Sequence, residues 1–425
     1  MSIRVVTSSV LRAWTSPLKR PSALPDPQRL TNAALFHSSN LQYSQSTSCK
    51  HFISIVNGLI RIKTSNPSHV DLQVNTMWLR DHCRCPTCFN DATNQRSTDV
   101  IDLTSKSVIT SASVLDGPKR VLSVKWNDGH DSTYDLDWIV DNWCNPQHER
   151  TSNLVLWSGA ELTKRGGLPA VPYGDVVNKK DGLKRLIKAV RVFGVGSISE
   201  SPVTYEDTQR VCEMVALPEE TIYGKFWKFS AENMAHADTA YSTLALGAHT
   251  DGTYYSQTVG LQVFHCLEHS GGEGGATLLV DGFKVAEELK ARDPKAFQFL
   301  ATNPIPCHYL EPGVHLHSDE PVIDLHPITG QLKQFRFNIY DRAPLNTFSS
   351  GKQVEEFYRA YTALAKIVRQ PDNEYWIKLQ PGTIVFIDNF RVMHGRSAFT
   401  GKRVLCGCYL QHDSFLSKAR VLGVY

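Results

Sequence analysis

The chain has 425 residues, of which 41% are hydrophobic and 20% charged, proportions typical of a globular protein with enough apolar surface for two cores. Its formal net charge is only +3, which argues against a nucleic-acid partner. Ten cysteines in this length are too few for a disulfide scaffold. No apolar run is long enough to cross a bilayer, so we expect no membrane span.

The first residues differ from the rest of the chain in their charge. Residues 1–36 hold five basic residues and one acid, Asp26, among serines, threonines and apolar residues. A start that is rich in arginine and poor in acids is typical of a mitochondrial transit peptide. A disordered tail is the alternative. We therefore assign residues 1–45 to a transit peptide and expect the protein in the mitochondrial matrix.

Residues 46–160 are expected to form a small β-rich domain. Short alternating runs such as Val121–Trp126 have the period of half-buried strands. Glycines and prolines in Gly166–Pro169 and Pro172–Gly174 mark the region of a linker. The remaining residues, 161–425, are expected to form a larger catalytic domain.

Three cysteines and one histidine of the smaller domain have the spacing of a metal site: Cys83, Cys85, Cys88 and His130. Tetrahedral zinc takes thiolate and imidazole ligands, and closely spaced cysteines can wrap around one ion. The pattern predicts a closed, structural zinc site. His82 and Cys144 are alternative fourth ligands, and free buried thiols are the alternative to any metal.

The larger domain contains a His-x-Asp pair, His249 and Asp251, and His394 follows much later in the chain. Two imidazoles and one carboxylate on one face of an octahedron form the ligand set of non-haem Fe(II) oxygenases. Residues 244–248 alternate like a strand that runs into a loop, so both members of the pair can reach one ion. A further His-x-Asp pair at His317 lies between prolines in a polar stretch, which predicts a surface loop.

Two strands are expected around the distant histidine. Gly382–Asp388 has the apolar run of a buried strand, Asn389–Gly395 is expected to turn, and Arg403–Leu410 is expected to return as a second strand. Before them, apolar residues from Val354 to Val368 recur at helical spacing after Ser350, which predicts a helix packed on the sheet.

The two faces of the returning strand carry different residues. Arg403 shares one face with Gly407 and Tyr409, while Cys406 and Cys408 share the other. A guanidinium that projects into an interior needs a carboxylate partner, which a dicarboxylate cosubstrate would supply. A structural ion pair is the alternative. The two cysteines are expected to be small core residues.

Several blocks of sequence, in order along the chain, resemble the gamma-butyrobetaine/trimethyllysine dioxygenases, which are Fe(II)- and 2-oxoglutarate-dependent oxygenases. The blocks include Trp78–Cys83, Thr221–Gly224, Asp238–Tyr241, Leu279–Phe283, Ile387–Arg391 and Cys406–Leu410. The resemblance implies a mainly β fold with flanking helices: a double-stranded β-helix, or jelly-roll, oxygenase domain after a small zinc-binding domain. It covers nearly the whole chain after the first 45 residues.

The resemblance also implies roles for individual residues. The iron ligands fall on His249, Asp251 and His394. The residues for 2-oxoglutarate are Arg403, Thr277 and Asn338. The residues for the substrate are Tyr223, Trp227, Asp238, Tyr241 and Tyr409. The four aromatic residues match an aromatic cage, which suits a quaternary ammonium because this group has no N–H to donate.

The expected reaction is hydroxylation of trimethyllysine, a small trimethylammonium amino acid, to its 3-hydroxy derivative, with O2 consumed and succinate and CO2 released. The resemblance places this reaction first in carnitine biosynthesis, with ascorbate keeping the iron ferrous, and relatives suggest a homodimer. Asp238 favours trimethyllysine because an aspartate can pair with its α-ammonium. The alternatives are hydroxylation of gamma-butyrobetaine and a zinc-bearing binding module without catalysis.

Overall fold

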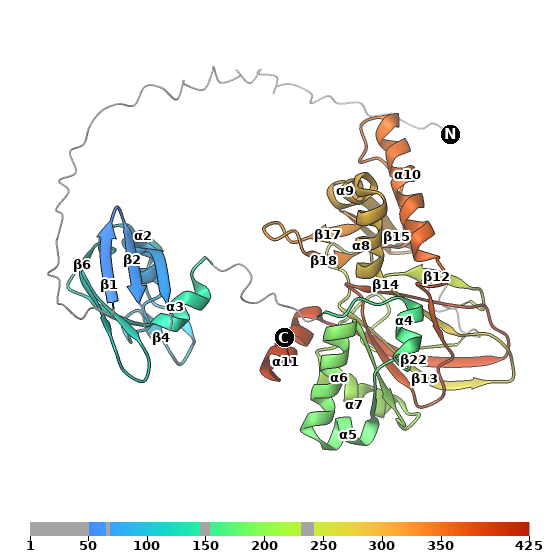
Figure 1. The fold of residues 1–425 in the computed structure, drawn as a ribbon. Coiled ribbons are helices and arrows are strands. Elements are labelled where there is room, and N and C mark those ends of the chain that lie inside the picture. The colour runs from blue at the N-terminus through green and yellow to red at the C-terminus, as the bar shows by residue number, and fades with distance from the viewer. Residues whose placement is uncertain (1–50, 65–68, 145–153, 231–241, 425) are drawn as a thin grey trace, which may run out of the picture. The chain divides into compact units, whose positions relative to one another are not determined.

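The computed structural model describes residues 51–64, 69–144, 154–230 and 242–424 (Figure 1). The chain divides into two compact units, Met1–Leu136 and Asp137–Tyr425, which we call unit 1 and unit 2. The domain limits 46–160 and 161–425 stay predictions; in the structure, Trp157 packs into the core of unit 2. None of the described helices combines the length and the apolar character that a membrane span requires.

Unit 1 is rich in short antiparallel strands. Its elements are β1 (His51–Val56), β2 (Leu59–Thr64), β3 (Val70–Asn75), α1 (Thr76–Asp81), β4 (Phe89–Asn90), β5 (Gln95–Arg96), α2 (Val100–Lys106), β6 (Ile109–Leu115), β7 (Val121–Trp126) and β8 (Asp131–Asp135), and α3 (Leu136–Asn142) begins at its boundary. One sheet has the order β1-β2-β3 and another the order β6-β7-β8. Strand β7 has the expected bounds, and its alternate residues Leu122, Val124 and Trp126 are buried.

Unit 2 is built on two sheets that share a core. The larger has the order β11-β22-β13-β20-β10-β9 and the smaller the order β12-β21-β14-β19. The larger sheet contains β9 (Ala170–Pro172), β10 (Val195–Ser199), β11 (Trp227–Ser230), β13 (Leu261–Ser270), β20 (Ile384–Asp388) and β22 (Lys402–Leu410). The smaller contains β12 (Leu246–His249), β14 (Thr277–Asp281), β19 (Tyr375–Ile377) and β21 (Val392–Arg396). Val385 and Leu405 of the first sheet pack with Leu279 and Val392 of the second.

Helices cover the outer faces of both sheets (Figure 1). The larger sheet is covered by α5 (Tyr173–Asn178), α6 (Lys180–Phe193), α7 (Tyr205–Val215) and α11 (His412–Val421). The smaller is covered by α8 (Gly282–Arg292), α9 (Pro294–Thr302) and α10 (Gly351–Val368). Helix α4 (Gly159–Lys164) lies beside β19. The mainly β fold with flanking helices is therefore confirmed, and so is the helix after Ser350, whose hydroxyl caps α10.

Strand β22 is buried on both faces, as its apolar run requires. Cys408 and Leu410 point toward the helices on the outer face, whereas Arg403, Leu405 and Tyr409 point toward the smaller sheet. The predicted alternation of this strand between two faces is confirmed, and the functional role of the face with Arg403 and Tyr409 stays a prediction.

His394 and its surroundings differ from expectation. The sequence predicted a turn over Asn389–Gly395, but the structure places His394 inside β21, and the turn ends earlier. The physical reason is pairing on two sides, because β21 lies between β12 and β14 and its backbone groups bond to both. His394 consequently has the fixed direction of a strand residue.

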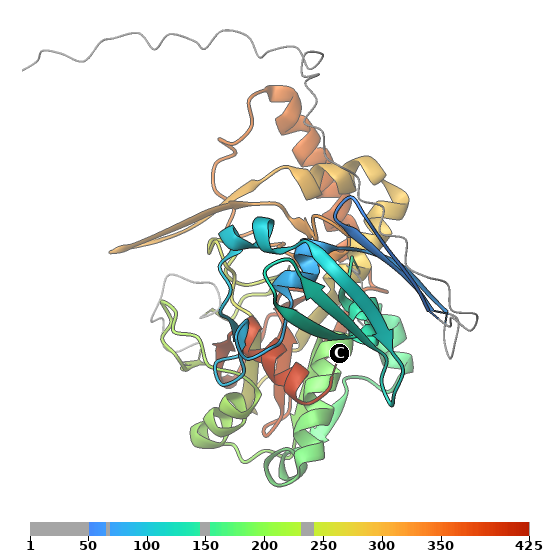
Figure 2. The ribbon, with the colours of Figure 1, turned by 90° about the vertical axis from the view of Figure 1, so that its left-hand side faces the viewer.

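One loop prediction is also wrong. The stretch around His317 is not a loop but strand β16 (Val314–Glu320), which pairs with β15 (Ile305–Glu311) in a hairpin that Figure 2 shows projecting from unit 2. His317 is nevertheless exposed, as expected for a surface residue. Of the expected linker residues, Pro172 belongs to the edge strand β9 beside β10, a position where proline is tolerated. The linker itself stays a prediction. A short pair, β17 (Ile323–Leu325) and β18 (Leu332–Phe335), completes the unit.

A buried ion pair joins distant segments of unit 2. The Arg391 guanidinium donates to both carboxylate oxygens of Asp281, at 3.0 and 2.7 Å, and to the carbonyl oxygens of Val155 (2.6 Å) and Val192 (2.9 Å). Both charged side chains are almost fully buried. Asp281 also accepts the backbone N–H of Trp157, at 3.1 Å. Because the segments of Val155–Trp157, Val192 and Asp281 meet Arg391 here, the pair fixes the turn between β20 and β21.

Replacing Arg391 with alanine should lower the free energy of unfolding by about 3–5 kcal/mol, because it leaves the Asp281 carboxylate buried without its partner. Denaturant unfolding measures the loss. The control is Arg292→Ala, which breaks an exposed pair with Glu288 and should change the value by less than about 1 kcal/mol. Equal effects of the two substitutions would contradict the role given to Arg391.

Candidate active site

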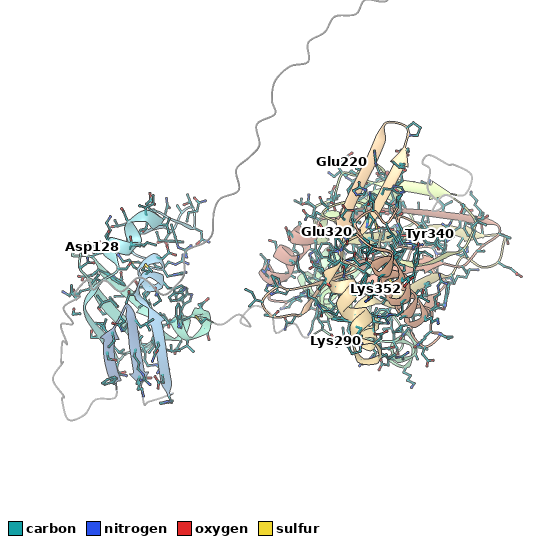
Figure 3. The ribbon with its side chains drawn as sticks, turned by 90° about the horizontal axis from the view of Figure 1, so that it is seen from above. Asp128, Glu220, Lys290, Glu320, Tyr340 and Lys352 are labelled. Atoms are coloured by element: carbon teal, nitrogen blue, oxygen red, sulfur yellow. The ribbon has the colours of Figure 1, made fainter. Side chains whose placement is uncertain are left out.

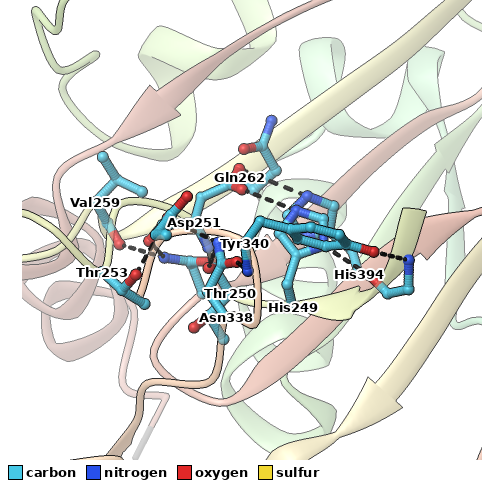
Figure 4. A network of polar contacts seen from close by, with 12 residues as sticks. His249, Thr250, Asp251, Thr253, Val259, Gln262, Asn338, Tyr340 and His394 are labelled. Carbon is cyan, nitrogen blue, oxygen red and sulfur yellow. Dashed lines mark hydrogen bonds and ion pairs between the residues drawn. The ribbon is translucent and has the colours of Figure 1, made fainter. Parts of the chain in front are cut away.

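A cavity lies between the two sheets of unit 2. His249, Asp251 and His394 line it together with Arg403 and several aromatic side chains. The structure therefore brings the three predicted iron ligands to one place, although they lie far apart in the sequence. Figure 4 shows the three side chains pointing toward one another.

The three side chains offer a compact set of ligand atoms. Asp251 Oδ1 lies 3.3 Å from His249 Nε2, and Asp251 Oδ2 lies 3.5 Å from His394 Nε2. One atom from each of the three residues falls within 4.8 Å of the others. Two nitrogens and one carboxylate oxygen at these separations fit a single divalent ion of the non-haem iron type.

Strand pairing orients the two histidines, and the buried side chain of Asn389 holds Asp251. His249 and His394 are direct partners across β12 and β21, and His249 Nδ1 lies 2.8 Å from the Gly247 carbonyl oxygen. A proton on Nδ1 would leave the Nε2 lone pair facing the cavity. The Asn389 side chain accepts the N–H of Asp251 (2.8 Å) and donates to the carbonyl oxygens of Asp251 and Val259 (both 3.0 Å).

The charge states also suit a metal. Burial alone would raise the pKa of Asp251, but the field of His394 and bonds from His249 and Tyr409 outweigh it and lower the pKa to about 2. Burial lowers the pKa of His394 to about 4. Near neutral pH the site therefore contains an ionised Asp251 beside a neutral His394, the forms that bind metals. For His249, burial lowers the pKa, but the hydrogen bond and charge of Asp251 outweigh it and raise the pKa.

Arg403 lines the same cavity with only 7% of its surface exposed. Burial lowers the pKa of its guanidinium, and its side chain packs over the ring of Phe399. No ion pair joins Arg403 to an acid of the described residues, so the structural ion pair considered for it is not found there. Thr277 of β14 is buried and lines the cavity as well. A cavity that contains a buried cation suits an anionic ligand.

Three of the predicted cage residues come together. The rings of Tyr223 and Trp227 lie 6.4 and 6.3 Å from the ring of Tyr409, and all three line the cavity. Gly407 makes this arrangement possible, because a Cβ there would lie 2.6 Å from the Trp227 ring and 1.9 Å from the carbonyl oxygen of Val263. Two further predicted substrate residues, Asp238 and Tyr241, lie outside the described residues.

Sequence reasoning missed several lining residues: Tyr254, Gln262, Tyr340, Asp341 and Arg396. Tyr254 lies beside a predicted cage residue, because its hydroxyl is 3.2 Å from that of Tyr223. Its position, three residues after Asp251, could have indicated that it lines the same cavity. Arg396 shares the face of β21 with His394, so the period of a strand could have indicated it.

Asn338 is engaged within its own loop. Its side-chain nitrogen donates to Asp341 Oδ2 (2.8 Å) and to the carbonyl oxygen of Thr250 (3.3 Å), while its oxygen accepts the N–H of Tyr340 (2.8 Å). It lines the cavity. Its expected contact with 2-oxoglutarate stays a prediction.

In unit 1 the predicted thiol cluster is assembled. His130 Nε2 lies 3.3, 3.5 and 3.6 Å from the sulfurs of Cys83, Cys85 and Cys88. Arg80 donates to the Cys88 sulfur at 3.1 Å, and it also pairs with Asp128, which is labelled in Figure 3. Ser132 donates to the Cys83 sulfur at 3.0 Å. Such donors stabilise thiolates, the form that binds zinc.

The alternative fourth ligands lie elsewhere. His82 stacks on Trp78 and places Nδ1 2.7 Å from the carbonyl oxygen of that residue. Cys144 is exposed and does not belong to the cluster. Among the described residues, the geometry favours His130.

Two family models match the chain. The first, described as "Taurine catabolism dioxygenase TauD, TfdA family", matches residues 158–409. The second, described as "Gamma-butyrobetaine hydroxylase-like, N-terminal", matches residues 58–140. The matched ranges fall largely in unit 2 and unit 1 respectively.

Named relatives match 82–83% of the chain. The chain is 40% identical to "Trimethyllysine dioxygenase, mitochondrial" of Rattus norvegicus over 359 residues, which cover 83% of this chain and 84% of that protein. The protein of the same name from Bos taurus is 39% identical, with 83% of each chain covered. "Trimethyllysine dioxygenase" of Meyerozyma guilliermondii is 35% identical and covers 82% of this chain and 90% of its own length.

Replacing Asn389 with leucine should destabilise unit 2 by about 1–3 kcal/mol, because it leaves the Asp251 N–H and two buried carbonyl oxygens without their partner. Urea unfolding measures the loss. The matched control is Asn346→Leu at an exposed position, which should change stability by less than about 0.5 kcal/mol. Wild-type stability of the Asn389 variant would show that this amide does not hold the Asp251 loop.

Proposed function

We propose a function from one premise: the chain belongs to the TauD, TfdA family of dioxygenases and, within it, to the trimethyllysine dioxygenases. The protein hydroxylates trimethyllysine at carbon 3, using O2 and 2-oxoglutarate and releasing succinate and CO2. This reaction is the first step of carnitine biosynthesis. The observation that carries the proposal is that one cavity contains the His-Asp-His set, a buried arginine and a group of aromatic rings.

His249, Asp251 and His394 would hold Fe(II), and Arg403 with Thr277 would bind the distal carboxylate of 2-oxoglutarate. When bound, the iron and its cosubstrate supply the oxidising chemistry, and ascorbate would keep the iron ferrous. Three protein ligands would leave part of the coordination of such an ion open to small molecules. Asn338 holds the loop beside this site through its bonds to Asp341 and Thr250.

The aromatic residues orient the substrate. A quaternary ammonium has no hydrogen to donate, so the π-faces of Tyr223, Trp227 and Tyr409 attract it electrostatically. Tyr254 would complete their cage, and Tyr241 is a further proposed member. Because the rings fix the ammonium end, the distance along the substrate decides which carbon lies beside the iron ligands.

Unit 1 would hold a structural zinc ion through Cys83, Cys85, Cys88 and His130. All four positions of a tetrahedral ion are then occupied by protein, which suits stability rather than catalysis. Residues 1–45 would direct the protein to the mitochondrial matrix, a proposal supported by the names of the relatives from Rattus norvegicus and Bos taurus. A homodimer is proposed as well.

Gamma-butyrobetaine hydroxylation is a second candidate, favoured by the family model that matches residues 58–140. An assay of purified enzyme with Fe(II), 2-oxoglutarate and ascorbate, run on each of the two substrates, distinguishes the two candidate functions. Mass spectrometry should detect hydroxylated trimethyllysine and one succinate for each product. Preference for gamma-butyrobetaine would overturn the assignment, and absence of substrate-dependent succinate would favour a binding module without catalysis.

His249→Ala should reduce turnover at least about 1000-fold, because it removes an iron ligand. The fold should remain, as thermal unfolding can verify. The matched control is His317→Ala, which alters the exposed His-x-Asp pair on β16 and should retain wild-type turnover. Activity that survives in the His249 variant would remove this residue from the iron site.

Replacing Cys83 and Cys88 together with serine should abolish zinc binding and lower the unfolding temperature of unit 1, because a structural metal contributes folding free energy. Elemental analysis and calorimetry measure the two effects. Cys144→Ser is the control and should retain the zinc, about one ion for each chain. An unchanged zinc content in the double variant would refute the site.

A further inference from the structure

One polar side chain of the cavity wall has no part in the function proposed so far. Gln262 of β13 lines the cavity, and only 1% of its surface is exposed. Its side-chain nitrogen donates to the carbonyl oxygen of Val263, at 3.4 Å. Its side-chain oxygen is buried and accepts no hydrogen bond from the described residues. Because the nitrogen already has a partner, the oxygen is the end of the amide that needs an explanation.

The neighbours of Gln262 on its own sheet are mostly apolar. The next cavity-lining residue along β13 is Phe264, and the direct partner on β20 is Ile387, a residue of the core. A buried amide oxygen that accepts no hydrogen bond is costly, whereas an apolar side chain of the same shape is not. A glutamine at such a position is therefore better explained by a ligand than by the stability of the fold.

The sheet register places Gln262 between the aromatic rings and the iron ligands. Its direct partner on β22 is Tyr409, and the Cβ atoms of such a pair lie about 5 Å apart. The Tyr409 ring belongs to the proposed cage, and its hydroxyl donates to Asp251 at 3.0 Å. Figure 4 shows Gln262 on the cavity wall together with Asp251 and the two histidines. The amide therefore lies beside the space that a trimethylammonium group in the cage would occupy.

Gln262 is distant from the part of the cavity that suits 2-oxoglutarate. Arg403 lies six residues before Tyr409 on β22, and its partner on β13 is His269. At about 3.3 Å for each residue, the backbone positions of Gln262 and Arg403 are on the order of 20 Å apart along the strands. The side-chain oxygen of Gln262 is thus placed for the substrate rather than for the cosubstrate.

We propose that Gln262 is a specificity-determining residue whose amide oxygen faces the methyl groups of the trimethylammonium end of the substrate. The inference rests on the proposed function, because it assumes that this end occupies the aromatic rings. The positive charge of a quaternary ammonium is spread over its methyl groups, which can form C–H···O contacts with a carbonyl oxygen. The rings attract the charge through their faces, and Gln262 adds the negative end of a dipole.

A neutral amide suits this place better than a carboxylate would. A second acid beside Asp251 could itself bind a metal ion, and its charge would raise the pKa of Asp251. An amide oxygen attracts a cation without either effect. It also distinguishes a charged ligand from a neutral one, because a tert-butyl group has the shape of trimethylammonium but no charge.

The test compares two substrates on wild-type enzyme and on Gln262→Met. The substrates are trimethyllysine and its carbon isostere, in which carbon replaces the quaternary nitrogen. Wild-type enzyme should prefer trimethyllysine by at least about 10-fold in kcat/KM, because the rings attract only the charged group. In Gln262→Met, which keeps an unbranched side chain of similar size, this preference should fall about 3- to 10-fold.

Thermal unfolding of the enzyme without substrate gives a second readout. Methionine removes a buried oxygen that accepts no hydrogen bond from the described residues, so the unfolding temperature should stay the same or rise. Gln262→Leu repeats both measurements with a second apolar side chain. The matched control is Gln298→Met at an exposed position of α9, which should change neither the preference nor the unfolding temperature.

The outcomes are distinct. A reduced preference together with an unchanged or higher unfolding temperature supports the proposal. An unchanged preference, an equal loss of activity on both substrates, or a lower unfolding temperature in both apolar variants overturns it, while the proposed function stands as long as the wild type hydroxylates trimethyllysine. If the wild type hydroxylates neither substrate, the proposed function fails, and this inference fails with it.

Discussion

The arrangement of the cavity depends on the buried ion pair between Arg391 and Asp281. Arg391 belongs to the turn between β20 and β21, and its bonds tie that turn to the end of β14. The same turn carries Asn389, which holds the Asp251 loop, and leads directly into the strand of His394. A buried pair is stable only when further hydrogen bonds satisfy its atoms, and two backbone carbonyl oxygens do so here. One electrostatic contact thus aligns ligands from different parts of the chain.

The wall of the cavity has two parts with different chemistry. Arg403 and Thr277 provide a cationic and hydrogen-bonding surface, which suits the anionic cosubstrate. Tyr223, Trp227 and Tyr409 provide aromatic faces, which suit a cation that cannot donate hydrogen bonds. Each surface therefore suits one of the two proposed molecules.

The sequence predicted those features that follow from local periodicity. The two faces of β22 and the helix after Ser350 follow from strand and helix spacing, and His249 with Asp251 follows from a motif at the end of a strand. Asp341 and Tyr340 could not be predicted, because they reach the cavity through a loop whose path depends on tertiary contacts.

The errors have a physical cause too. Residues 314–320 are polar and follow a proline, but pairing with β15 makes them a strand. The length of the turn before His394 was overestimated because β21 gains partners on both sides, which no local pattern reveals. The spacing of residues along a strand predicts which side chains face the same way, but it does not identify the molecule that they bind. The roles of the individual site residues are therefore proposals.

The Tyr409 hydroxyl donates a hydrogen bond to Asp251 Oδ2 at 3.0 Å while its ring lines the cavity between the two sheets. One side chain thus serves both as a wall of the binding site and as a modulator of electron density on the carboxylate next to the metal position. Evolution cannot reshape that wall without also retuning the ligand strength of the acid. Under the proposed function, selectivity and metal affinity would be inherited together at this residue, so a lineage that acquired a new substrate by changing it would have to readjust how tightly it keeps its metal.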